Sequence, residues 1–158
     1  MFQIGDYIVY PTQGAGVIEA IEEKEILGEK RPYYIIKMKI IKMQVMIPLG
    51  KEKNARIRIV SDDHTLEEVM EIFHHGETNT NLSMKERYKI NTEKLKTGGM
   101  KDGAEVVRDL LRINKKKSLN SSEKQMLESA RKIFIGELGL IKGITDHQAA
   151  DMLNDQVS

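Results

Sequence analysis

The residues with the clearest chemical potential lie between Met84 and Lys101. This stretch holds six basic and two acidic side chains, a local charge of +4, whereas the whole chain of 158 residues has a net charge of only +1. The basic residues are Lys85, Arg87, Lys89, Lys94, Lys96 and Lys101. A local basic patch can bind phosphate groups on a protein that is neutral overall. The pattern allows contact with a nucleic acid, and the alternative is a core stripe with ordinary solvated flanks.

The helix expected over residues 83–97 has an apolar stripe with cations on both flanks. At 100° per residue the stripe contains Met84, Tyr88, Asn91 and Leu95. Met84 opens the helix, where an apolar side chain is less easily buried than at mid-helix. Methionine is among the residue types that proteins insert as wedges against base steps. Two interpretations of Met84 follow: a wedge against a duplex, or a core residue at a helix end.

Residue patterns typical of enzymes and metal sites are missing from the sequence. The chain has no cysteine, which excludes disulfides and thiolate zinc sites. His74 and His75 are adjacent, and no carboxylate cluster is placed to complete a metal site with them. No phosphate-binding loop, dinucleotide fingerprint or nucleophile elbow occurs. We therefore predict a protein that is not an enzyme and that needs no cofactor and no metal.

The same composition bears on the compartment. A chain without cysteine fits a reducing cytoplasm. No apolar run approaches the roughly 20 residues that span a bilayer, and the first residues do not resemble a signal peptide. We expect a cytoplasmic protein with no membrane partner.

Two kinds of secondary structure must position these residues. Short β-branched and aromatic runs separated by Gly, Pro and polar turns predict strands over 7–10, 17–21, 33–38, 43–48 and 56–60. Five strands at this spacing are typical of a small SH3-like or Tudor-like β-barrel. The resulting prediction is an N-terminal barrel domain over residues 1–60.

From residue 61 onward the apolar period changes to 3.6 residues. Cap-like pairs three residues apart recur, namely Thr65 with Glu68, Ser83 with Glu86, Asp102 with Glu105, Asn120 with Glu123 and Thr145 with Gln148. They predict helices over 65–75, 83–97, 103–114, 121–141 and 146–156, with Lys115, Lys116 and Lys117 in a loop. The predicted fold class is α+β, with the barrel followed by a compact all-helical domain over residues 61–158.

The whole chain, from Phe2 to about Leu153, resembles the CarD/CdnL family of bacterial RNA polymerase-binding transcription regulators. The matching segments include Gly5-Asp6 through Tyr10-Pro11, residues 19–22, Arg87-Tyr88-Lys89, residues 104–110 and Gly136-Glu137-Leu138. The resemblance implies a Tudor-like N-terminal domain that binds the β subunit of RNA polymerase. It also implies a helical domain that contacts promoter DNA near the upstream edge of the transcription bubble. The family is non-enzymatic and changes how readily the open promoter complex forms and persists.

Site residues follow from this resemblance position by position. Lys24 falls where relatives use a basic side chain against the polymerase, and Met46 falls where some relatives have an arginine. Met84 matches the position of a tryptophan that wedges into the minor groove in relatives, and this chain has no tryptophan. Arg87 and Lys89 match basic residues near DNA.

Polymerase docking by strand pairing is expected at the edge formed by Val45, Met46 and Ile47. Met84, Lys85, Arg87 and Lys89 are the expected DNA-binding residues. The partners implied are the polymerase β subunit and promoter DNA. We expect a monomer that reaches the nucleoid through the polymerase. The alternative function is a polymerase-docking protein adaptor without functional DNA contact.

Overall fold

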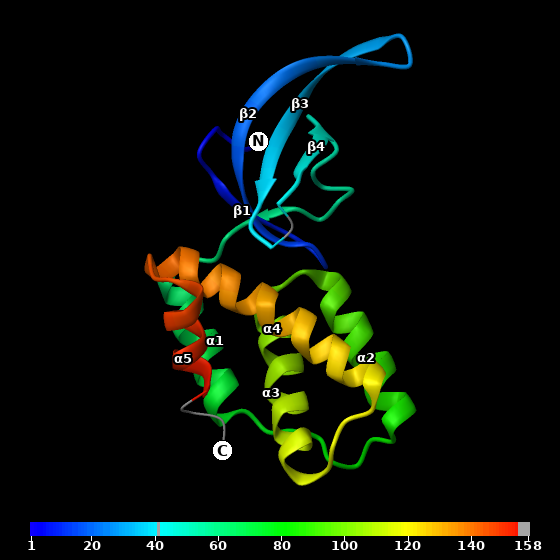
Figure 1. Ribbon diagram of the computed structural model, residues 1–158, viewed down its shortest axis with the longest axis vertical. Coiled ribbons are helices and arrows are strands. Elements are labelled where there is room, and N and C mark those ends of the chain that lie inside the picture. Colours follow the sequence, from blue (N-terminus) through cyan, green and yellow to red (C-terminus); the bar gives the residue numbers. More distant parts are fainter. Residues whose placement is uncertain (41, 155–158) are drawn as a thin grey trace.

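A computed structural model describes residues 1–40 and 42–154 of the chain. Within these residues, five strands come first and five helices follow. The sheet forms one body, and the helices form a second body below it (Figure 1). The predicted α+β class is confirmed by this order of elements.

The sheet is antiparallel, with the strand order β4-β3-β2-β1-β5. Its strands are β1 (Tyr7–Tyr10), β2 (Gly14–Ile26), β3 (Glu29–Met38), β4 (Gln44–Pro48) and β5 (Arg58–Ile59). All five predicted strands are present; β1 has the predicted bounds and the other four have shifted ends. The largest difference is in β2 and β3, which continue past the body of the sheet as a hairpin arm (Figure 1).

The hairpin arm closes through a two-residue turn. Leu27 and Gly28 both have positive φ, at 54° and 80°. Positive φ at both central residues gives a turn whose twist matches that of the flanking strands. Leucine has no intrinsic preference for this conformation, and here its side chain is fully exposed. The turn lies between the strands predicted over 17–21 and 33–38.

The sheet bends around one apolar core. Its fully buried members include Ile8, Ile18, Tyr34 and Ile36, which come from three neighbouring strands. Residues two apart on a strand point to the same face, so this core uses one face of each strand. The register breaks between Ile18 and Ala20, where a bulge in β2 changes which residues face inward.

The helical body contains α1 (Asp63–His75), α2 (Met84–Thr97), α3 (Met100–Lys116), α4 (Ser121–Lys142) and α5 (Asp146–Asn154). Residues 155 and 156 of the last predicted helix lie outside the described part of the chain. The core holds Phe73, Leu110, Phe134, Leu138 and Leu153, all buried. The rings of Phe73 and Phe134 meet with centroids 5.5 Å apart, which joins α1 to α4.

Two predicted helix starts are wrong. The α1 cap is Asp62, whose side chain accepts a hydrogen bond from the Thr65 N–H at 2.8 Å, so Thr65 lies inside the helix. The α3 helix begins at Met100 instead of residue 103, because Met100 is buried in the helical core and extends the packed face. Asp102 instead accepts a hydrogen bond from the Thr97 hydroxyl at 2.6 Å.

The basic run after α3 is also placed differently. Lys115 and Lys116 form the last turn of α3 rather than a loop. Cations are favoured there because the helix dipole places partial negative charge at its C-terminal end. Over residues 1–40 and 42–154, no helix combines the length and the apolar character required to cross a membrane.

Candidate functional site

One candidate surface is the free edge of the sheet at β4. Strand order places β4 at one end, and residues 45–47 were the expected docking edge. The side chain of Ile47 is buried in the sheet core, and Val45 packs against the same core. Met46 points to the opposite face and is 44% exposed. Of the three expected side chains, only Met46 is available to a partner.

At the outer edge of β4, the backbone N–H and C=O groups of alternate residues have no neighbouring strand to bond to within the described part of the chain. Met38 N–H donates to Met43 O at 3.3 Å, and Leu49 N–H donates to Pro32 O at 3.1 Å. In an antiparallel ladder every second residue bonds to its neighbouring strand and the residues between point away. Positions 43, 45, 47 and 49 therefore face β3. Gln44 and Met46 direct their N–H and C=O groups to the open edge.

Lys24 lies on the hairpin arm, on the same face of the sheet as Met46. Register pairs Lys24 with Arg31 and Ile35 with Met46, and alternate residues along β3 connect the two pairs on one face. The Lys24 ammonium is 3.1 Å from the Glu22 carboxylate, and both side chains are more than 40% exposed. An exposed pair of this kind holds its partners weakly, so Lys24 remains able to meet another charge.

The second candidate surface is one flank of α2. Lys85, Lys89 and Lys96 are exposed and lie on one stripe, with Tyr88 beside them at 42% exposure. No ion pair is found for these three lysines within the part of the chain that the structure describes. This flank offers positive charge and an aromatic ring to solvent together.

The opposite flank of α2 faces the protein, and Arg87, one of the expected DNA-binding residues, lies on it. The Arg87 guanidinium makes two hydrogen bonds of 2.7 Å to the carboxylate of Glu123 on α4. Glu123 is fully buried and the Arg87 side chain is only 16% exposed. The hydrogen bond to Glu123 raises the pKa of Arg87 above its ordinary value. Arg87 therefore ties α2 to α4, and its charge is already neutralised.

Other residues of the predicted stripe divide between the two sides. Asn91 is buried and Leu95 packs against the helical core, whereas Met84 is 46% exposed. The Met84 sulfur lies 2.8 Å from Nδ2 of Asn120, the cap residue of α4. Met84 is therefore a surface residue that rests against α4, and the core interpretation of its side chain is wrong.

The start of α2 is fixed by a complete capping box. Ser83 accepts a hydrogen bond from the Glu86 N–H, and the Glu86 carboxylate accepts one from the Ser83 N–H. The hydrogen bonds from Ser83 lower the pKa of Glu86, so it is ionised beside the exposed lysines. The predicted cap is confirmed, and with it a negative charge at the edge of the basic flank.

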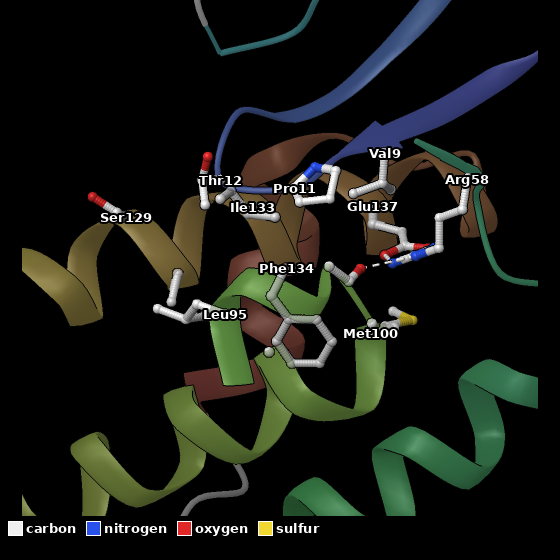
Figure 2. A pocket seen from close by; sticks show the side chains of 14 residues that line it. Val9, Pro11, Thr12, Arg58, Leu95, Met100, Ser129, Ile133, Phe134 and Glu137 are labelled. Atoms are coloured by element: carbon white, nitrogen blue, oxygen red, sulfur yellow. Dashed lines mark hydrogen bonds and ion pairs between the residues drawn. The ribbon is translucent and has the colours of Figure 1, made fainter. Parts of the chain in front are cut away.

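Sequence reasoning missed a buried contact between the two bodies. Glu137 on α4 is 2% exposed, and its carboxylate accepts two hydrogen bonds of 2.7 Å from the Arg58 guanidinium of β5. The Ser61 N–H donates a third at 2.8 Å. Figure 2 shows Arg58 and Glu137 facing each other across this contact, beside Val9. We call the contact around Pro11, Arg58, Gly98 and Glu137 the joint.

Comparisons with known proteins cover both bodies. Residues 2–61 match the CarD-like/TRCF RID domain, and residues 68–154 match the CarD C-terminal domain. A Bacillus subtilis (strain 168) protein named "Putative transcription factor YdeB" is 58% identical over 148 residues, which cover 94% of this chain and 97% of that protein. A solution structure of the 72-residue N-terminal domain of Myxococcus xanthus CarD is 32% identical, with a TM-score of 0.33 over 39% of this chain and 83% of that one.

Proposed function

Because the chain belongs to the CarD family of transcription factors, we propose that it binds RNA polymerase through its sheet and promoter DNA through α2. The polymerase contact is with the β subunit, and the DNA contact is near the upstream edge of the bubble. The single observation that carries the proposal is the exposed row of Lys85, Lys89 and Lys96 beside Tyr88 and Met84. A transcription factor of this kind acts in the cytoplasm and reaches the nucleoid with the polymerase.

The open edge of β4 supports docking by strand addition. In this mode a partner strand bonds to free backbone groups, and neighbouring side chains provide specificity. Gln44 and Met46 supply those groups, and the Met46 side chain lies on the same face as Lys24. Pro48 has no N–H to donate, so it ends the pairing row. We propose residues 1–60 as the polymerase-binding domain and residues 61–158 as the DNA-contacting domain.

The α2 surface supports a DNA contact of moderate strength. Three unpaired lysines release counterions when they meet phosphates, and Met84 and Tyr88 offer an apolar side chain and a ring to unstacked bases. Arg87 is not part of this contact, because Glu123 holds it. Weak intrinsic affinity is sufficient, since a factor bound to polymerase is already at high effective concentration near the promoter.

The proposed mechanism is a shift of the promoter equilibrium. A factor that binds the open complex better than the closed one moves that equilibrium by its differential affinity. About 1.4 kcal/mol of differential affinity changes the ratio tenfold. A few lysine–phosphate contacts and one apolar contact at the fork supply a difference of this order.

Polymerase docking is tested by Met46→Pro, compared with Met46→Ala. Proline removes the outward N–H of Met46 but no hydrogen bond between β3 and β4, and alanine removes only the side chain. We expect Met46→Pro to lose binding to the polymerase β subunit while the helices stay folded by circular dichroism. Equal binding by the proline variant and the wild type would contradict docking at this edge.

The DNA contact is tested by the dissociation rate of open complexes under competitor challenge. We expect wild-type protein to prolong the complex, and Lys85→Gln/Lys89→Gln and Met84→Ala to reduce the prolongation. A control with the same charge change, Lys116→Gln/Lys117→Gln, should behave as wild type. If every α2 variant prolongs the complex as wild type does, the protein is an adaptor without functional DNA contact.

A further inference from the structure

The joint connects the sheet to the C-terminal end of α2. The Arg58 guanidinium that holds Glu137 also donates from Nε to the carbonyl oxygen of Gly98, at 2.9 Å. Gly98 is the C-cap of α2. Arg56 donates to the carbonyl oxygen of Lys96, at 3.3 Å. One edge of the sheet therefore holds the end of the helix whose other end carries Met84.

Directional bonds at this joint act together with close packing, since a Cβ built at Gly98 would lie 2.5 Å from Pro11. A cavity of about 110 Å³ lies between the two bodies, lined by Pro11 from the sheet and by Leu95, Met100 and Phe134 from the helices. Figure 2 shows these side chains around the space next to Glu137. The cavity leaves part of this contact unpacked, whereas a bidentate carboxylate–guanidinium pair fixes both distance and plane.

The length of α2 amplifies any rocking at the joint. From Thr97 to Met84 the helix rises about 20 Å at 1.5 Å per residue. A rotation of about 10° at the joint would move Met84 by about 3–4 Å over that length. A shift of this size is larger than the range of distances over which a hydrogen bond or an inserted side chain keeps its contact.

We propose that Arg58 and Glu137 are positioning residues that hold α2 in a fixed direction relative to the polymerase-docking sheet. The proposal rests on the proposed function. Neither residue contacts polymerase or DNA, yet the effect on the open complex depends on their ion pair. The protein thus holds its two proposed binding surfaces at a fixed distance and orientation.

The test measures geometry and function in the same variants. Since the chain has no cysteine, Glu25→Cys on the hairpin arm and Asn81→Cys before α2 give two specific spin-label sites. We expect Glu137→Gln and Arg58→Lys to broaden the distance distribution between the labels. Arg58→Lys keeps the charge but loses the planar fork. Asp146→Asn is the control, since it removes the exposed Lys39–Asp146 pair, which also joins the two bodies.

The same variants are assayed for open-complex lifetime and for polymerase binding. We expect Glu137→Gln and Arg58→Lys to lose most of the prolongation while polymerase affinity and helix content match the wild type. An unchanged distance distribution would overturn the proposal, as would a broadened distribution with unchanged lifetime. If wild-type protein does not prolong open complexes, the proposed function fails, and the label distances still report separately whether the ion pair holds the joint.

Discussion

Arg87 offers the sharpest test of how α2 is oriented. Replacing Arg87 with glutamine would leave the Glu123 carboxylate fully buried without its ionic partner. Removing one member of a buried ion pair costs about 3–5 kcal/mol. For a chain of this size that corresponds to a fall in Tm of about 6–20 °C. We expect this loss in urea and thermal unfolding.

Two further variants separate stability from DNA contact. Lys89→Gln, on the exposed flank of the same helix, should change stability by less than about 0.5 kcal/mol. The double substitution Arg87→Met/Glu123→Leu removes both charges and should recover much of the lost stability, because a buried pair replaced by apolar groups is often nearly neutral. An Arg87→Gln protein as stable as Lys89→Gln, with a weaker effect on open complexes, would refute the buried role of Arg87.

Three other perturbations have expected outcomes. Burial and the neighbouring His75 lower the pKa of His74 from its ordinary value of 6.5. The unfolded chain therefore binds a proton at His74 more readily than the folded protein does, so the free energy of unfolding should fall as pH drops through about 6.5. In urea unfolding at pH 8 and 5.5, His74→Gln should reduce this dependence of stability on pH. Gly98→Ala should destabilise more than Gly143→Ala in the same assay, because both have positive φ but only the Gly98 Cβ would meet a Pro11 atom, at 2.5 Å. Glu86→Lys should lengthen open-complex lifetime and steepen its salt dependence, and an unchanged salt slope would contradict phosphate contact at this end of α2.

The elements of this fold were largely predictable because they depend on local patterns. The five strands and five helices follow from period, turn residues and caps, as at Ser83 and Glu86. The orientation of α2 was not predictable, because cations lie on both of its flanks. A carboxylate on α4, 36 residues from Arg87, decides which flank is buried.

The same reason explains why the joint was missed. In sequence, Glu137 is one of many charged residues on a helix, and nothing local marks it as buried. Arg58 is likewise one of several basic residues near the end of the sheet.

The pattern of residues 43–48 predicts a strand, but the position of this strand at the edge depends on the order of all five strands. Resemblance to a family supplied site positions that local patterns could not.

The ion pair at the joint can form only late in biosynthesis. Arg58 and Glu137 are 79 residues apart, so all five strands leave the ribosome well before their partner on α4 does. At 5–20 residues per second this interval lasts about 4–16 s. During it the nascent sheet has its β4 edge but no fixed helical body. If the proposed function holds, a chain cut short in this interval would keep the proposed polymerase-docking edge without the proposed DNA-contacting helix held in place, and would compete with its own full-length product.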